Sequence, residues 1–457
     1  MINVIFSEGV IRVELENLKE LIASKKLSEA KKILLEMNEF DIASLIEELP
    51  STELMQVFRL LPKNIATDVF VNLDDHVQVE LIASLTRKES KVIIEDMFTD
   101  DAADLFDEMP ATMVTSLLSN VDADTRNTIN KLLKYPENSA GSLMAIEYIH
   151  LKKGLTLKES IDRIRKQKED FVSYDCCFVT DEHRKLLGRV DVKELLTNDL
   201  DSLIDDVMND CEHYITTMMD QEEVAKMFRD YDYSTLPVVD KEQRLVGIIT
   251  IDDIVDIMEA EATEDMQKMA AILPTDDSYD NTGIFKTYKA RIPWLLLLMI
   301  SATFTGKIIQ GFEDKLAACA ILTAFIPMIM DTGGNAGGQA SVSIIRALSL
   351  NQIEFKDILK VLWKEIRVAV LCAITLAICN FGKLLVIDGV TYKVAATVCL
   401  TLVCVVVLAK VIGSSLPMFA KKIGFDPAVM ASPFITTIVD ACALLIYFYI
   451  AGAVLGI

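Results

Sequence analysis

The chain has 457 residues, 51% of them hydrophobic, and a formal net charge of −23 at pH 7. From Arg291 onward there are 13 Lys and Arg and 9 Asp and Glu, so the first 290 residues carry a net charge of −27. This length allows three or four domains, and the charge distribution predicts an acidic cytosolic half followed by a membrane half. Such acidity excludes nucleic acid as a partner, because its phosphates would be repelled.

Residues 20–135 are predicted to form short helices in a repeating pattern. Segments starting at Phe40, Asn64 and Asp101 each show an apolar helical face, a turn with Pro or Asp, and a second apolar helical face. Helical units that cannot bury such faces alone stack on their neighbours. We therefore predict an all-α superhelical N-terminal domain, residues 1–136, with an ordinary irregular helical bundle as the alternative.

A second repeat follows, in which two segments share one order of elements. Each has a helix, an apolar strand, a charged turn that ends near a glycine, a second strand and the start of another helix. This α/β order resembles a tandem pair of CBS domains, residues 137–200 and 201–258. The resemblance implies that a hydroxyl and a carboxylate three residues later bind an adenosine nucleotide such as ATP, and these are Thr250 and Asp253 in the second copy.

The first CBS copy differs at the corresponding positions, which hold Asp191 and Glu194. Two carboxylates at that place would repel the phosphates of a nucleotide. Nucleotide binding is therefore disfavoured in the first copy. A purely structural CBS pair is the alternative for both copies.

Seven carboxylates and no Lys or Arg lie in a predicted helix between Asp252 and Asp265. Glu261 is one helical turn from both Glu264 and Asp265, and like charges at that spacing destabilise a helix by roughly 0.2–0.5 kcal/mol per pair. Such a run is usually a solvated face, but here a membrane segment follows closely. We expect a cation to compensate these charges, and we assign residues 259–290 to an acidic connecting (plug) helix and a linker.

Five apolar segments are predicted to cross the membrane in a five-helix domain, residues 291–457. They are Ile292–Phe312, Leu316–Leu348, Ile366–Ile387, Val394–Phe419 and Ala428–Ile457. The second segment is too long for one plain crossing, and we expect the glycine-rich stretch Gly333–Gln339 to break it. Lys and Arg gather in the loops after the second and fourth segments. The positive-inside rule then predicts a multi-pass protein of the plasma (cell inner) membrane, with a cytoplasmic N-terminus and an extracellular C-terminus.

Two carboxylates are predicted at membrane depth, where ionisable groups are costly and usually functional. They are Asp440, in the middle of the last segment, and Asp331, in the second. The residues that we expect to line a pore are Gly333, Gly334, Asn335 and Gly337. The alternatives are an ion pair between Asp440 and Lys410 and close helix packing at the glycines. Oxygen ligands without a Cys or His cluster favour a hard cation such as Mg²⁺ or Ca²⁺.

Taken together, the acidic helical domain, the CBS repeats, the helix EATEDMQKM, the segment GGNAGGQ and the last-segment aspartate resemble the MgtE family of magnesium channels. The resemblance implies a homodimer in a lipid bilayer, with a pore on the dimer axis that cytosolic Mg²⁺ closes. The metal-contacting residues that it implies are Asp440, Asp426, Asp253, Asp256, Glu261, Glu264, Asp265, Asp101 and Asp104. Among them, Asp440 is implied in the pore and Asp426 at its cytosolic mouth.

The expected function is passive, Mg²⁺-gated uptake of Mg²⁺ for magnesium homeostasis. A pump is disfavoured because the chain has no GxxxxGK[ST] loop, and no nucleophile–base constellation indicates an enzyme. The nine Cys form no CxxC pair, so neither a zinc site nor a disulfide framework is indicated. An alternative from another class is a membrane-anchored CBS sensor that regulates a partner without itself conducting.

Overall fold

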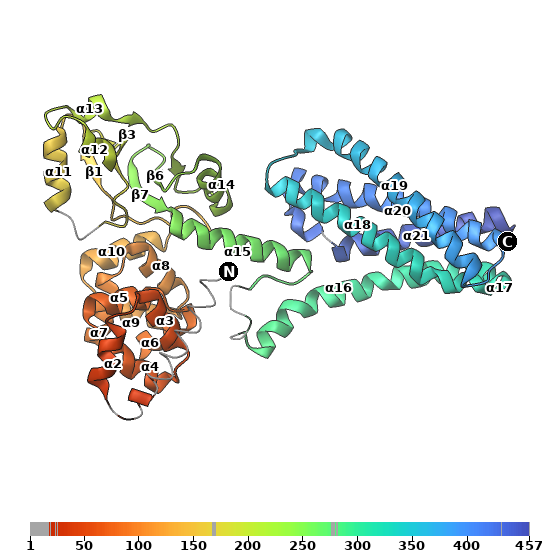
Figure 1. Cartoon of the computed structure of the whole chain (residues 1–457), viewed down its shortest axis with the longest axis horizontal. Coiled ribbons are helices and arrows are strands. Elements are labelled where there is room, and N and C mark those ends of the chain that lie inside the picture. The colour runs from red at the N-terminus through yellow and green to blue at the C-terminus, as the bar shows by residue number, and fades with distance from the viewer. Residues whose placement is uncertain are drawn as a thin grey trace. The chain divides into compact units, whose positions relative to one another are not determined.

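The computed structural model describes residues 18, 20–22, 24, 26–166, 171–275, 279, 282–430 and 432–456. The chain consists of two compact units, Met1–Met258 and Glu259–Ile457 (Figure 1). The helix α15 (Ile251–Met269) begins in the first unit and ends in the second.

Short helices of eight to ten residues form the first part of unit 1. Their bounds are α2 (Leu27–Leu34), α3 (Glu39–Glu47), α4 (Ser51–Phe58), α5 (Lys63–Val71), α6 (Asp75–Ser84), α7 (Arg87–Asp96), α8 (Thr99–Asp107), α9 (Ala111–Leu118) and α10 (Ala123–Leu132). Local signals set several of the starts: Thr86, for example, forms a capping box with Glu89 at the start of α7. Helices this short are marginal alone, so their stability comes from packing.

From α3 to α8, each helix packs on the helix two places further along the chain: α3 on α5, α4 on α6, α5 on α7, α6 on α8, α7 on α9 and α8 on α10. One continuous apolar core runs through the stack and includes Ile46, Phe70 and Phe106. This is the packing expected of helical repeats. The predicted superhelical domain is therefore confirmed.

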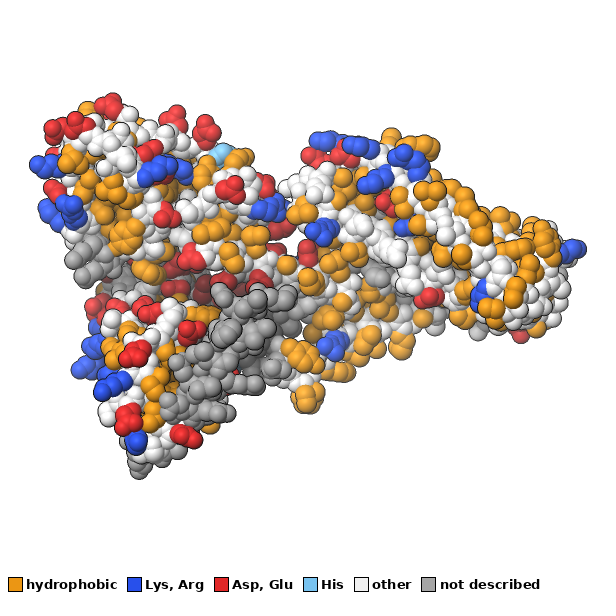
Figure 2. All heavy atoms as spheres, in the orientation of Figure 1, with side chains coloured by type: hydrophobic (Ala, Val, Ile, Leu, Met, Phe, Trp, Pro, Cys, Tyr) orange, Lys and Arg blue, Asp and Glu red, His pale blue; other side chains and the backbone are white. Residues whose placement is uncertain are grey.

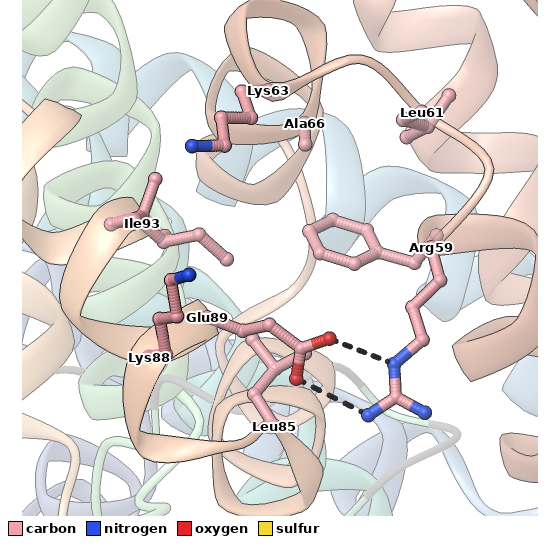
Figure 3. A pocket seen from close by; sticks show the side chains of 10 residues that line it. Arg59, Leu61, Lys63, Ala66, Leu85, Lys88, Glu89 and Ile93 are labelled. Carbon is pink, nitrogen blue, oxygen red and sulfur yellow. Dashed lines mark hydrogen bonds and ion pairs between the residues drawn. The ribbon is translucent and has the colours of Figure 1, made fainter.

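A groove of about 440 Å³ opens between α4, α5 and α7 (Figure 3). Ile93 contributes to its apolar wall, and the side chains of Lys63 and Lys88 lie at its edge. An ion pair between Arg59 Nε and Glu89 Oε1, 3.1 Å long, joins α4's end to α7. No predicted site residue lines this groove, which is a gap between stacked helices.

The rest of unit 1 contains two small sheets that repeat one topology. The first sheet has β1 (His150–Lys152), β2 (Cys176–Thr180), β3 (Leu186–Asp191) and β4 (Asn209–Asp210), and the second has β5 (Ile215–Thr216), β6 (Thr235–Val239) and β7 (Leu245–Thr250). The accompanying helices are α11 (Leu157–Lys166), α12 (Val192–Thr197), α13 (Ile204–Val207) and α14 (Gln221–Tyr231). In both sheets a parallel pair adjoins an antiparallel pair. Both antiparallel pairs shift register at equivalent places, after Val179 and after Val238. The CBS pair predicted from the sequence repeat is confirmed.

Unit 2 is made of long helices after the end of α15. They are α16 (Ile284–Gly311), α18 (Ile326–Ser349), α19 (Ile358–Val386), α20 (Tyr392–Lys422) and α21 (Ser432–Leu455), joined by α17 (Glu313–Ala318), η1 (Ala320–Phe325), η2 (Phe355–Asp357) and η3 (Pro427–Met430). Hydrophobic side chains cover much of the visible face of these helices (Figure 2). The core element is α20, which packs against α18, α19 and α21.

Four stretches among the described residues are long and apolar enough to cross a membrane. They are Ile284–Gly311, Phe355–Val386, Tyr392–Lys422 and Pro427–Leu455. The remaining long helix, α18, has 24 residues, about 36 Å at 1.5 Å per residue, but Asp, Asn, Gln and Gly residues lower its hydropathy. A fifth crossing by α18 therefore stays a prediction.

The glycine-rich stretch does not break the second predicted span, and that expectation is wrong. The helix α18 continues from Ile326 to Ser349 through all these glycines, and the chain changes direction earlier, at η1. A Cβ atom on Gly333 would lie 2.7 Å from Val405 Cγ1, and one on Gly334 would lie 2.9 Å from Thr436 Cγ2. Close packing of α20 and α21 on the glycines thus compensates for their poor helix propensity.

Candidate cation sites

Acidic side chains from distant parts of the sequence meet in unit 1, at α8 and the start of α15. This acidic cluster consists of Asp100, Asp101, Asp104, Glu147, Asp252 and Asp253. Ala103 of α8 shares one apolar core with Ile254 and Ile257 of α15, which holds the two helices together. The Thr99 hydroxyl at the start of α8 donates a 2.9 Å hydrogen bond to Glu147 Oε2.

Among the described residues, the charges that act most strongly on the acidic cluster are negative. Burial, then the charge of Asp253, raises the pKa of Asp101 to about 7. Asp104 is still accessible to solvent, but the protein around it and then the charge of Asp101 raise its pKa to about 7 as well. Burial and the neighbouring Asp101 raise the pKa of Asp100, which is 6% exposed, well above its usual range. A bound cation would relieve this repulsion directly.

The acidic cluster is not a closed cage of ligands. Within the described ranges, no three Asp, Glu, His or Cys side chains converge as the ligands of a metal ion would. Mg²⁺ dehydrates reluctantly and is often held through its waters by one or two carboxylates. A region of high negative charge therefore suits Mg²⁺, held through its waters, better than a metal that needs several direct ligands.

Three of the predicted metal contacts, Asp101, Asp104 and Asp253, belong to the acidic cluster. The other three members, Asp100, Glu147 and Asp252, were not predicted as metal contacts, although Asp252 belongs to the acidic run for which we expected a compensating cation. Glu147 lies outside any acidic run, and its place beside α8 depends on how the CBS pair packs on the helical domain. Asp100 is adjacent to a predicted residue, so the run of acids at the start of α8 was the signal that could have identified it.

Thr250 and Asp253, the two residues predicted to bind a nucleotide in the second CBS copy, contact each other directly. Thr250 Oγ1, at the end of β7, donates a 2.8 Å hydrogen bond to Asp253 Oδ2, in the first turn of α15. Burial raises the pKa of Asp253, although the hydrogen bond from Thr250 opposes this. In the first copy, Asp191 and Glu194 instead form a capping box at the start of α12, which is a structural role.

The remaining predicted contacts on α15 are Asp256, Glu261, Glu264 and Asp265, and all lie in one continuous helix. Glu264 Oε1 is 2.6 Å from Lys268 Nζ, one turn further along. The same ammonium is 2.7 Å from Asp426 Oδ2, in the connection between α20 and α21. Asp426, predicted to contact a metal, therefore has a lysine as its partner in this structure.

Asp440, on α21, has an unusual environment for a carboxylate. Its Oδ1 atom is buried and is without a hydrogen-bond partner in the part of the chain that the structure describes. Asp331 of α18 is near enough to act on it through its charge. The alternative in which Lys410 pairs with Asp440 is not found among the described residues.

The predicted pore-lining residues divide between two faces of α18. Gly333, Gly334 and Gly337 are buried against neighbouring helices, as the packing alternative proposed. Asn335 is exposed and lines an open groove of about 510 Å³ between α18, α19 and α20. Asp331 lies one turn before it in the same groove, so a polar stripe runs along this face of α18.

Comparisons with known proteins cover almost the whole chain. Residues 326–450 match the family model for a divalent cation transporter domain, MgtE, residues 37–138 match the MgtE intracellular N domain, and residues 204–260 match the CBS domain. The magnesium transporter MgtE of Thermus thermophilus is 34% identical, over 96% of this chain and 98% of its own. The protein of the same name from Bacillus subtilis is 29% identical, over 99% and 98%.

A solved structure extends the likeness to the fold of unit 1. It is the cytosolic domain of the Mg²⁺ channel MgtE in complex with ATP, 32% identical, with a TM-score of 0.52 over 53% of this chain and 99% of that one. The order of domains, the CBS repeat and the helices of unit 2 agree with these matches. The chain therefore belongs to the MgtE family of magnesium transporters.

Proposed function

We propose that this protein carries Mg²⁺ passively across the plasma membrane and that cytosolic Mg²⁺ closes its pore. The names of its relatives support magnesium as the ion carried. The observation that carries the proposal is that Asp440 Oδ1, on an apolar helix, is buried and has no hydrogen-bond partner among the described residues. A carboxylate left in this state costs free energy, and a passing cation would provide the missing partner.

The polar stripe of α18 supports a path for the ion. Asp331 and Asn335 present oxygen atoms to an open groove, and Asp331 acts on Asp440 by its charge. A single aspartate per chain holds a hydrated Mg²⁺ weakly, whereas two related by a two-fold axis would hold it better. A homodimer in the lipid bilayer with its pore on the axis is thus part of the proposal.

Gating would follow from the charge of the cytosolic parts. At low Mg²⁺ the acidic cluster and the α15 carboxylates repel one another, which favours an open state. At high Mg²⁺ the ions compensate these charges and draw α15 toward a closed state. A ligand shifts such an equilibrium only by its difference in affinity for the two states, and the raised pKa of Asp101 supports strong cation binding where the acids are brought together.

Two finer points belong to the same proposal. The CBS pair would bind ATP through Thr250 and Asp253, which the ATP complex of a structural neighbour supports. The basic loops after α18 and α20 support a cytoplasmic N-terminus and, with five crossings, an extracellular C-terminus. No catalytic role is proposed for any residue.

Replacing Asp440 tests the proposed pore. We expect Asp440→Asn to reduce Mg²⁺ uptake into proteoliposomes by about tenfold or more, the effect of 1.4 kcal/mol on the barrier, because the ion loses a charged partner. A fluorescent Mg²⁺ indicator inside the vesicles measures uptake. Asp314→Asn is the matched control, since Asp314 is exposed on α17, and it should conduct like the wild type.

Two outcomes would refute the proposal. If Asp440→Asn took up Mg²⁺ as fast as the wild type and eluted like the wild type in size-exclusion chromatography, Asp440 would not belong to the ion pathway. No uptake by the wild-type protein would favour the membrane-anchored CBS sensor instead.

A further inference from the structure

Lys268 connects two segments of unit 2 that are far apart in the sequence. Its Nζ atom lies 2.6 Å from Glu264 Oε1 on α15 and 2.7 Å from Asp426 Oδ2 between α20 and α21. The lysine side chain is 22% exposed, and both carboxylates are about one-third exposed. Short charge-assisted hydrogen bonds of this kind are stronger than neutral ones.

The surroundings of Lys268 hold both ends of this arrangement in place. The next residue, Met269, packs against Ile345 of α18 and Ala428 of η3, both of which are buried. The other carboxylate oxygen of Asp426 accepts a 2.8 Å hydrogen bond from the backbone N–H of Ala428. The apolar contact of Met269 and the ion pairs of Lys268 therefore join the end of α15 to α18 and to the connection between α20 and α21.

The charges around Lys268 favour its ion pairs with Glu264 and Asp426. Burial lowers the pKa of the ammonium, but the hydrogen bonds and charges of Asp426 and Glu264 outweigh burial and raise the pKa well above its usual value. With an ordinary pKa of about 10.4, a lysine ammonium is charged at physiological pH. In this structure the Lys268 ammonium compensates the charges of Glu264 and Asp426.

We propose that Lys268 is a built-in cation that keeps the end of α15 docked on the α20–α21 connection when Mg²⁺ is scarce. The proposal rests on the proposed function, in which the position of α15 controls the pore. Lys268 then supplies a Mg²⁺-independent share of closure, which limits how often the pore is open at low Mg²⁺. It is a positioning residue, because it acts on the pore through α15.

Lys268 and Mg²⁺ should compete for the same two carboxylates, Glu264 and Asp426. Glu264 and Asp426 can bind either the ammonium or a divalent cation as their common partner, because both cations need the same oxygen atoms. Removal of the lysine charge leaves two acids facing each other, which repel at low Mg²⁺ and bind Mg²⁺ at high concentration. The effect of Lys268 should therefore be large in EDTA and small in saturating Mg²⁺.

Lys268→Met tests this, because methionine keeps the apolar stem and removes the charge. In patch recordings of the full-length protein with EDTA on the cytosolic side, we expect open probability to rise roughly 3- to 10-fold, the range for loss of two partly exposed ion pairs. Saturating Mg²⁺ should still close the variant. Lys289→Met on exposed α16 surface is the matched control and should behave as the wild type.

A charge exchange and a structural measurement complete the test. In Lys268→Glu/Asp426→Lys the new lysine can bridge the acids at positions 264 and 268, so open probability in EDTA should return toward the wild-type value. Hydrogen exchange at the end of α15 should be faster in Lys268→Met than in the wild type, again in EDTA. This readout does not depend on transport.

The outcomes separate the two proposals. Unchanged open probability and unchanged exchange in Lys268→Met would overturn the role of Lys268 while leaving the channel intact. Failure of saturating Mg²⁺ to close that variant would overturn the shared use of the carboxylates. A wild-type protein that conducts no Mg²⁺ would instead refute the proposed function, and the exchange measurement would still report on the docking of α15.

Discussion

At the scale of single residues, carboxylates of one chemical type differ because their surroundings differ. Asp426 has an ammonium and a backbone N–H as partners, so the chain compensates its charge. Asp101 is surrounded by other acids, and Asp440 Oδ1 has no partner in the described part of the chain. We therefore expect a divalent cation to bind more strongly at Asp101 and Asp440 than at Asp426, whose charge a lysine of the chain already compensates.

The raised pKa values of Asp101 and Asp104 predict that the stability of the protein depends on pH. Their pKa values are about 7 in the folded protein against an ordinary 3.8, so between these limits the folded state binds more protons than the unfolded state. The free energy of unfolding must then fall as pH rises from about 4 to 7. In EDTA we expect the thermal midpoint of the full-length protein to be lower at pH 8 than at pH 5. Millimolar Mg²⁺ should reduce this difference.

Asp101→Asn removes one of these charges. In EDTA at pH 8 the substitution should raise the thermal midpoint by about 2–4 °C for each kcal/mol of repulsion relieved. Mg²⁺ should stabilise the variant less than it stabilises the wild type. Asp124→Asn, at an exposed position of α10, should change neither value. If Mg²⁺ stabilised Asp101→Asn as much as the wild type, the acidic cluster would not be a cation site.

At the scale of elements, the glycines of α18 act through helix packing. A Cβ atom on Gly337 would lie 2.9 Å from Ile435 Cγ2 on α21, and one on Gly413 of α20 would meet the Gly337 carbonyl oxygen. The backbones of α18 and α20 approach this closely only because both positions lack a side chain. Asp331 and Asn335 lie on another face of α18, where they line the open groove between α18, α19 and α20.

Gly413→Ala should therefore separate α18 from α20. Overpacking of this kind costs about 1–3 kcal/mol, and we expect a lower thermal midpoint in detergent. Gly382→Ala is the matched control, since a Cβ atom on Gly382 of α19 meets nothing within 4 Å and alanine favours the helix. Equal midpoints for the two variants would contradict the packing role of the glycine face.

The elements that the sequence predicts well are those with a local periodic signal. The helical repeats and the two CBS copies fall in this class, because each unit carries its own apolar pattern. The continuity of α18 depends on α20 and α21, so its glycines alone indicate a break. The partnership of Lys268 with Asp426 joins residues 158 positions apart, and no spacing rule connects them, although Lys268 is one turn from Glu264.

At the scale of the whole molecule, the first 290 residues carry a net charge of −27 and the rest carry +4. In physiological salt, charges further apart than about 8 Å are largely screened. Overall repulsion is thus too short-ranged to control a gate by itself. Closely placed groups such as the acidic cluster must do so, and they respond to an ion that binds rather than to one that only screens.

Binding and screening should differ in their effect on how compact the full-length protein is. If Mg²⁺ bridges acidic groups, it should raise the sedimentation coefficient of the protein in nanodiscs relative to EDTA, while KCl of equal ionic strength should not. Asp101→Asn should weaken the response to Mg²⁺, because the acidic cluster loses part of its charge, whereas Asp124→Asn should keep it. Equal compaction by KCl would mean that screening alone closes the structure, and it would contradict gating by bound Mg²⁺.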